Sequence, residues 1–209
     1  MIFKDIPQGS PEWFALRAGH VTASNVSDCS AKARDGKSEG VTRKKYRTRI
    51  VTEWLTGRPA ESGFKSEAME RGNNVEPIAR AAYEARVGDF VDQITFATHD
   101  EIKNFGASPD GLVGSDGLVE IKCPMSHTHY TYLSEGKVPA EYKDQMIAQC
   151  AVLKRKYVDF ISFDDRFPAK MQLFVVRFEP SEKEISEMES AVVEFLEECR
   201  KEYDKWVQK

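Results

Sequence analysis

With 209 residues, this chain has the length of one domain, which buries about 70% of the surface that its unfolded form exposes. Hydrophobic residues make up 41% and charged residues 31%, an ordinary globular composition that excludes disordered, collagen-like and coiled-coil-only proteins. The four cysteines lie far apart with no C-x-x-C pair. That spacing excludes a zinc ribbon and a secreted disulfide framework, and it predicts a reducing, cytoplasmic environment.

Charge is distributed unevenly although the net charge is only −4. Residues 31–58 carry nine Lys or Arg against three acids, and residues 179–204 carry ten acids against three bases. This asymmetry predicts one face for a polyanion and one that repels it. The alternative is that both segments are simply the solvated faces of two helices. If the charge distribution is the only evidence considered, this alternative is favoured. No run reaches the ~18 apolar residues of a membrane span, so no membrane association is expected.

The first third of the chain predicts helices and loops. Thr22 begins a segment that can open a helix, and the polar residues 30–42 predict an exposed loop. Apolar residues recur at helical spacing over 44–55 and again over about 66–86. Pro77 lies inside the second stretch, so it either begins a new helix or kinks a long one.

The middle of the chain changes to short β-branched and aromatic runs, which predict strands at 94–98, 105–107, 111–113, 118–122, 157–163 and 171–178. A helix is expected at about 141–154 between the fourth and fifth strands. Ser181 and Glu184 form a capping box that opens a long amphipathic C-terminal helix. The pattern predicts a single α/β domain over 1–209: helices in 1–90, a mixed central β-sheet in 91–180 and the terminal helix in 181–209.

One hairpin concentrates the polar residues that could carry chemistry. Residues 114–117 form a turn between two apolar runs. With a three-residue loop, Asp110 lies directly opposite Glu120, and with a two-residue loop the pairing shifts by one. The period of two places Glu120 and Lys122 on one face of the strand.

Two carboxylates so close repel each other unless a cation lies between them. Compact oxygen sites suit Mg²⁺, and Mn²⁺ is compatible with the same donors. Lys122 would then lie beside the metal, placed to orient or deprotonate a water molecule. The alternative is a surface hairpin with a cross-strand Glu–Lys pair. That alternative does not explain why acid and base interrupt an apolar strand, so the metal site is favoured.

The spacing from Asp110 to Glu120-Ile-Lys122 resembles the PD-(D/E)xK signature of nucleases with a restriction-endonuclease-like core. The segments EWFALRAGHVTAS (12–24), RGNNVEP (71–77), SPDGL (108–112) and EIKCP (120–124) follow in order. Together they resemble the phage lambda exonuclease family, the YqaJ-like viral recombination exonucleases. The similarity spans roughly residues 10–168.

The resemblance implies roles for single residues. Asp110 and Glu120 would bind the metal together with the backbone carbonyl of Ile121, and Glu76 would support the site. Lys122 and a helix glutamine would position water. The family's glutamine corresponds to Gln145, with Gln149, on the same helical face, in reserve. Arg17 and Ser24 match the residues that bind a terminal 5′-phosphate.

The same resemblance implies a Mg²⁺-dependent 5′-to-3′ exonuclease that uses two ions and acts on double-stranded DNA ends. It further implies a homotrimeric ring, a single-strand annealing protein as partner and a phage or prophage origin. The basic segment would face the DNA and the acidic helix would stay outside. The alternatives are a RecB-like single-strand or structure-specific nuclease and a non-catalytic DNA-binding module.

The histidines predict little chemistry. His127 and His129 would point the same way on a strand, but no Cys or carboxylate completes a metal site. Surface positions are therefore expected for them, and also for His20 and His99.

Overall fold

The computed structural model describes residues 1–3, 5–33, 36, 38–60 and 67–208, and the side chains of 67–69 are not considered. The helices, in chain order, are α1 (Pro11–Arg17), the 3₁₀ helix η1 (Ala23–Ser30), α2 (Val41–Thr56), α3 (Glu67–Val87), α4 (Ser126–Glu135), η2 (Ala140–Tyr142), α5 (Lys143–Leu153), η3 (Ala169–Met171) and α6 (Glu182–Val207). The strands are β1 (Ile2–Phe3), β2 (Val21–Thr22), β3 (Val91–Asp92), β4 (Phe96–Thr98), β5 (Phe105–Ala107), β6 (Gly111–Val113), β7 (Gly117–Lys122), β8 (Tyr157–Phe163) and β9 (Leu173–Phe178).

The strands form two mixed sheets. A five-stranded sheet has the order β3-β6-β7-β8-β9, in which β7 and β8 are parallel and the other pairs antiparallel. A four-stranded sheet has the order β1-β4-β5-β2. The expected mixed α/β fold with flanking helices is confirmed, but its sheet is divided in two.

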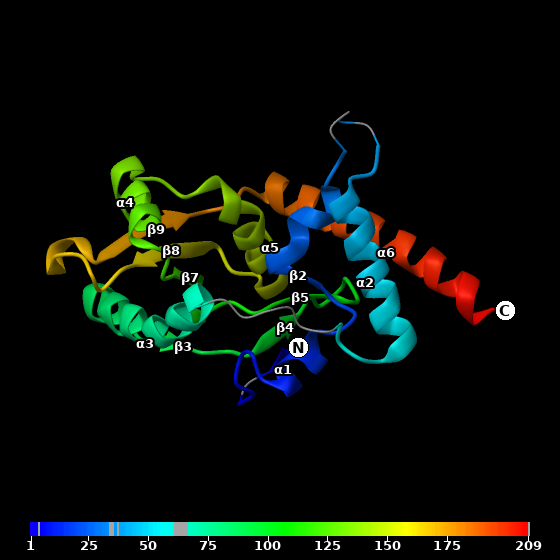
Figure 1. Cartoon of the computed structure of the whole chain (residues 1–209), viewed down its shortest axis with the longest axis horizontal. Coiled ribbons are helices and arrows are strands. Elements are labelled where there is room, and N and C mark those ends of the chain that lie inside the picture. Colours follow the sequence, from blue (N-terminus) through cyan, green and yellow to red (C-terminus); the bar gives the residue numbers. More distant parts are fainter. Residues whose placement is uncertain (4, 34–35, 37, 61–66, 209) are drawn as a thin grey trace.

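Helices cover both faces of the five-stranded sheet (Figure 1). On one face, α3 packs Val75, Ala79 and Tyr83 against Val119 of β7 and other apolar residues of β7 and β8. On the other face, α5 lies between the sheet and α6, and its buried residues join the larger apolar cluster. The long α6 is opened by the predicted capping box at Ser181. Among the described helices, none is long and apolar enough to span a bilayer.

Most predicted elements are found within a few residues of their expected ends. Helix α2 covers 44–55, and strands β5, β6 and β8 have the expected bounds. The segment that begins at Thr22 is a 3₁₀ helix instead of an α-helix. Of the predicted loop 30–42, residues 34, 35 and 37 lie outside the described residues, and Lys32 and Glu39 form an isolated bridge. The helix predicted from Ser66 begins, within the described residues, at Glu67.

Pro77 lies inside one continuous helix, α3. Proline removes one intrahelical hydrogen bond, because it has no N–H to donate to the carbonyl four residues earlier. Val75 and Ala79, on either side of Pro77, are both buried against the sheet. Burial on both sides outweighs the lost hydrogen bond and keeps the helix in one piece.

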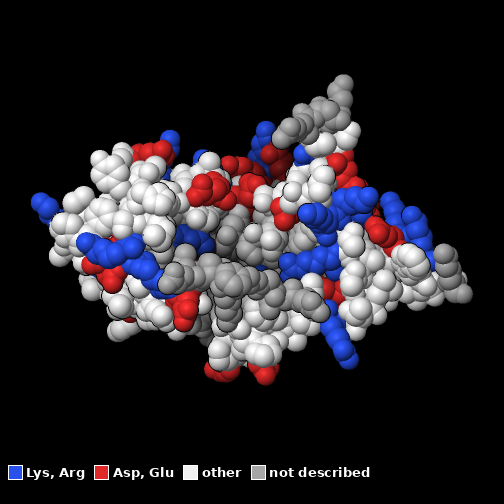
Figure 2. All heavy atoms as spheres, viewed as in Figure 1, with Lys and Arg blue, Asp and Glu red and all other residues white. Residues whose placement is uncertain are grey.

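The expected separation of a basic DNA face from an acidic outer helix is wrong for the centre of α2. Arg43 donates to Glu198 at 2.7 Å, and Arg47 donates to Glu202 at 2.9 Å. Figure 2 shows Lys and Arg beside Asp and Glu over α2 and α6, with no continuous basic face there. The charge asymmetry along the sequence is therefore partly neutralised where the basic helix packs against the acidic one.

Candidate active site

The hairpin of β6 and β7 places two carboxylates side by side. Its pairs are Gly111 with Val119, Leu112 with Leu118, and Val113 with Gly117. This register leaves a three-residue turn at 114–116 and continues to Asp110 opposite Glu120, as predicted for the longer loop.

The two faces of β7 have different surroundings, as the period of two predicts. Val119 and Ile121 are buried against α3 and its neighbours. Glu120 lies on the opposite face and is only 1% exposed. A carboxylate at this depth requires hydrogen-bonded or charged partners, because burial disfavours its ionised form.

Three side chains contact the Glu120 carboxylate. The Lys122 ammonium lies 2.5 Å from Oε1, and the Gln145 amide donates to the same oxygen at 2.6 Å. Gln149 donates to Oε2 at 2.6 Å. Both glutamines of α5 therefore hold one carboxylate, where the sequence left a choice between them. The Gln149 Oε1 atom is buried and has no hydrogen-bond partner within the described part of the chain.

Asp110 and Glu76 belong to the same electrostatic cluster. Burial, reinforced by the charge of Glu120, raises the pKa of Asp110 well above its usual value. Burial also raises the pKa of Glu76, which the charge of Arg80 opposes and that of Glu120 supports. Glu76 forms an ion pair with Arg80 at 2.5 Å, the partner that a solvated helix acid would have. Its interaction with Glu120 nevertheless places Glu76 beside the candidate site.

The Lys122 ammonium lies between opposite charges and an aromatic ring. Burial alone would lower its pKa, but the charges of Glu120 and Asp110 outweigh burial and raise it. The ammonium lies 5.0 Å from the ring centroid of Tyr142, a cation–π contact that the sequence analysis missed. Tyr142 lies in the short 3₁₀ helix η2 before α5, within the segment for which the sequence predicted a helix, but no motif marked its side chain as part of the site.

The donors present fit a hard divalent cation. The amide of Ile121 donates to Asp110 Oδ2 at 2.6 Å. In a strand, the N–H and C=O of one residue face the same neighbour, so the Ile121 carbonyl also faces the side of Asp110. Two carboxylates and this carbonyl form an oxygen-only set suited to Mg²⁺. No group of three His, Cys, Asp or Glu side chains that could hold a metal exists among the described residues, so the carbonyl, water or substrate would supply the remaining ligands.

Arg17 and Ser24 lie together, as the resemblance implied. Arg17 Nη2 donates to Ser24 Oγ at 3.2 Å, and its guanidinium stacks 3.9 Å from the Trp13 ring centroid. Burial lowers the pKa of Arg17 to about 10, so the group stays charged at neutral pH. A guanidinium and a hydroxyl at the start of a helix suit a phosphate group.

Trp13 connects this pair to the hairpin. The Trp13 indole N–H donates to Ser108 Oγ at 3.2 Å and to the carbonyl of Thr95 at 3.2 Å. Ser108 precedes Asp110 by two residues. The Arg17–Ser24 pair is therefore anchored to the segment that carries the first carboxylate.

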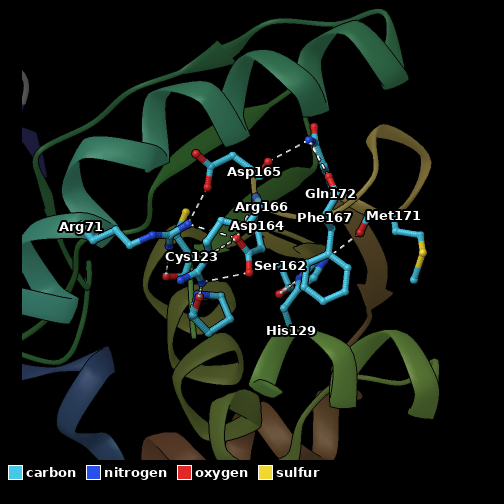
Figure 3. Close-up of polar contacts among 11 residues, drawn as sticks. Arg71, Cys123, His129, Ser162, Asp164, Asp165, Arg166, Phe167, Met171 and Gln172 are labelled. Atoms are coloured by element: carbon cyan, nitrogen blue, oxygen red, sulfur yellow. Dashed lines mark hydrogen bonds and ion pairs between the residues drawn. The ribbon is translucent and has the colours of Figure 1, made fainter. Parts of the chain in front are cut away.

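A second charged cluster holds the segment after Lys122 (Figure 3). Asp164 accepts from Arg71 at 3.1 Å and from Arg166 Nε at 2.7 Å. Arg71 also donates to the carbonyl of Cys123 at 3.5 Å, and Arg166 donates to that of Pro124 at 3.4 Å. The end of β8 is thus tied to the residues that leave β7 directly after Lys122.

Residues 12–156 match the family described as the YqaJ-like viral recombinase domain. The chain belongs to this family. It is also similar to LHK-Exo, an alkaline exonuclease from Laribacter hongkongensis, with 41% identity and a TM-score of 0.86. That match covers 95% of this chain and 97% of the other. The structure of LHK-Exo in complex with dAMP matches equally well.

A phage-related exonuclease from Haemophilus somnus 129PT shares the fold at 17% identity and a TM-score of 0.65, covering 90% of this chain and 95% of that one. No curated protein matches the chain. The family resemblance drawn from the sequence motifs is therefore confirmed, and so is the nuclease fold.

The histidine predictions are partly wrong. His127 and His129 lie on helix α4, not on a strand. His129 is fully buried, with Nδ1 2.7 Å from Ser162 Oγ and Nε2 2.9 Å from the carbonyl of Met171 (Figure 3). His99 is also buried and contacts Glu189 at 3.2 Å. Both make buried polar contacts within the fold, and the aromatic, β-branched sequence of α4 had hidden its helical character.

Proposed function

We propose that this chain is a Mg²⁺-dependent deoxyribonuclease that degrades double-stranded DNA from its ends in the 5′-to-3′ direction and leaves 3′ single-stranded overhangs. The observation that carries the proposal is the buried acidic cluster around Glu120, whose charge Lys122 and Arg80 only partly balance. Membership of the YqaJ-like family and the similarity to an alkaline exonuclease support it.

In this mechanism, Asp110, Glu120 and the carbonyl of Ile121 would hold the Mg²⁺ ion, for which Mn²⁺ could substitute, and a second ion is expected at the site. The bound metal supplies a Lewis acid that stabilises negative charge developing on the scissile phosphate. The Lys122 ammonium orients the attacking water and can donate a proton through a hydrogen bond. Gln145 and Gln149 keep the Glu120 carboxylate in one orientation, and Glu76 contributes negative charge from α3.

The Arg17–Ser24 pair supports the 5′-to-3′ polarity. A phosphate monoester at a strand end carries more charge than an internal diester, so a guanidinium and a hydroxyl favour it. Because Trp13 anchors this pair to the Asp110 segment, a bound 5′-phosphate would set the register of the terminal nucleotide relative to the carboxylates.

We further propose a homotrimeric ring that encloses the duplex and passes its product to a single-strand annealing protein in the cytoplasm of a bacterial host. The resemblance to phage recombination exonucleases supports this assembly. The ion pairs of Arg43 and Arg47 with α6 leave Lys44 and Lys45, which are exposed, as candidate cations for the DNA backbone.

One experiment tests the activity and its polarity. Linear duplex labelled separately at each 5′ and 3′ terminus is incubated with the protein in Mg²⁺ or in EDTA. The proposal predicts Mg²⁺-dependent release of mononucleotides from the 5′ ends, while the labels at the 3′ termini stay on the overhangs. Preferred cleavage of single strands would identify a RecB-like nuclease. DNA binding without cleavage in Mg²⁺ would identify a non-catalytic module. The mass in solution, measured in parallel, tests the trimer.

A further inference from the structure

The Arg17–Ser24 pair depends on the conformation of the short link that joins α1 to η1. Gly19, in this link, has a φ of +71°, a left-handed conformation that side chains rarely adopt. A Cβ at this position would lie 2.5 Å from Trp54 Cδ1. The link therefore needs a glycine at this position. Because glycine makes the backbone flexible, contacts from other parts of the fold must restrain the link if Arg17 is to stay beside Ser24.

Helix α2 supplies that restraint from one of its faces. Glu53 Oε2 accepts from the backbone N–H of Gly19 at 2.7 Å, and the Trp54 indole donates to the carbonyl of Gly19 at 2.7 Å. Farther along the link, Tyr46 Oη accepts from the N–H of Thr22 at 3.1 Å. Both backbone groups of Gly19 are thus held by neighbouring side chains of one helix.

Glu53 does more than accept this one hydrogen bond. It is 3% exposed, and its Oε1 also accepts from the N–H of Ala60 at 2.9 Å and from Arg49 Nε at 3.1 Å. Arg49 is close enough to Arg17 for its charge to lower the pKa of Arg17, after the larger effect of burial. Glu53 therefore connects the Gly19 turn to a second guanidinium whose charge acts on Arg17, and the negative charge of Glu53 opposes the repulsion between the two guanidiniums.

We propose that Glu53 is a positioning residue that sets the selectivity for 5′-phosphorylated ends, because it fixes the Gly19 turn behind Arg17 and holds Arg49 beside it. This inference rests on the proposed function. Glu53 does not contact the phosphate itself, and it acts through Arg17, Ser24 and Arg49. Trp54 supports the same turn through one hydrogen bond.

The test compares duplexes that differ only in a 5′-phosphate or a 5′-hydroxyl, using kcat/KM for both. Glu53→Gln keeps an acceptor for Gly19 but loses the ion pair with Arg49. We expect the phosphate-to-hydroxyl ratio to fall roughly tenfold, within the ~100-fold that misplacing a group by ~1 Å can cost. The fall should come from a higher KM for the phosphorylated duplex, with cleavage of the hydroxyl duplex unchanged.

Three further variants keep the test decisive. Trp54→Phe retains an aromatic ring but removes the five-membered ring that carries the N–H, so it should lower the ratio about threefold, as expected for loss of one hydrogen bond. Glu202→Gln is the matched control, because Glu202 also pairs with an arginine of α2 but from α6, away from the link. It should leave the ratio at the wild-type value, and Arg17→Ala should bring the ratio to one.

The outcomes separate this inference from the proposed function. If the wild-type protein does not distinguish the two ends, the phosphate pocket of the proposed function is wrong. If it does distinguish them, but Glu53→Gln and Trp54→Phe keep the full ratio, the positioning role of Glu53 is wrong. Equal loss of kcat on both substrates would also overturn that role, since it would make Glu53 merely structural. Should Glu53→Gln not fold, Trp54→Phe alone decides.

Discussion

Two charged clusters lie at the ends of the paired strands β7 and β8, and they differ in how their charges balance. At the candidate active site, Asp110, Glu120 and Glu76 face Lys122 and Arg80, and the pKa values of Asp110 and Glu76 are raised. At the other cluster, Asp164 is fully buried between two arginines. Burial would raise its pKa, but the hydrogen bonds from Arg166 and Ser126 outweigh burial and lower it to about 2.

This difference separates a site for chemistry from a structural cluster. We call the second cluster, Asp164 with Arg71 and Arg166, the clamp. A cluster whose charges are satisfied gains nothing from a further ion, and it stabilises the fold. A cluster with excess negative charge is strained in isolation and favours a cation. The same residue types therefore serve opposite purposes, depending on how many positive partners lie within reach.

The largest expected effect is on the cleavage rate, and it is expected at the candidate active site but not at the clamp. Lys122→Ala should lower the cleavage rate by about 10²–10⁴-fold, the range for loss of a proton-transfer group, and leave DNA binding nearly intact. Single-turnover cleavage and a binding titration measure the two effects. Equal loss of binding and cleavage would show that Lys122 only supports the fold and would remove the contrast between the clusters.

A large effect on stability is expected at the clamp. Asp164→Ala leaves two guanidiniums without their shared partner and should cost about 3 kcal/mol, the low end for a broken buried pair because both arginines are partly exposed. Urea denaturation measures the loss.

The same clamp should show a pH dependence with a definite sign. Because the pKa of Asp164 is lowered on folding, its contribution is complete above the unfolded pKa of about 4 and is lost as pH falls through about 2. Asp164→Asn should flatten this part of the acid-unfolding curve. An unchanged curve would contradict the ionised clamp.

A smaller effect, of opposite sign, is expected at the active site. Asp110→Asn keeps an acceptor for the Ile121 amide and removes repulsion from Glu120. In EDTA, we expect the variant to be about 1 kcal/mol more stable than the wild type, against the usual destabilising trend. Adding Mg²⁺ should raise the melting temperature of the wild type only. A destabilised variant in EDTA would mean that Asp110 is already balanced without metal.

The smallest effect sets the baseline for both clusters. Asp116 and Lys156 form an ion pair at 2.9 Å, with exposed side chains. Asp116→Asn should change neither the melting temperature nor the cleavage rate measurably, since exposed pairs are screened by water and salt. A clear loss in either measurement would show that charge changes near the hairpin act generally, and it would weaken the assignments at Asp110 and Asp164.

The elements with strong local patterns could be predicted from the sequence. The capping box at Ser181 and the apolar period of α6 predicted the last helix. The glycine-bounded turn predicted the hairpin, but only the structure decides between the two registers that it allowed. Strands β1, β2 and β3 have two residues each, too few for an alternation to appear. Their pairing is decided by tertiary contacts.

The site could be predicted as far as sequence neighbours and motifs extend. Asp110, Glu120 and Lys122 come together through one hairpin, and the glutamines lie on one helical face. Glu53 and Trp54 gave no signal, because a helix acid and an apolar tryptophan are ordinary residues in α2. Only the fold reveals that both hold Gly19.

The parallel pairing of β7 and β8 also affects the order in which this protein becomes able to act. Parallel neighbours need a crossover, and here residues 123–156 make it and bring Gln145 and Gln149 back to Glu120 from 25 and 29 positions away. Contacts between distant residues form slowly. A newly synthesised chain therefore carries its acidic hairpin before its active site is complete. The return of cleavage activity during refolding should coincide with the slowest structural phase.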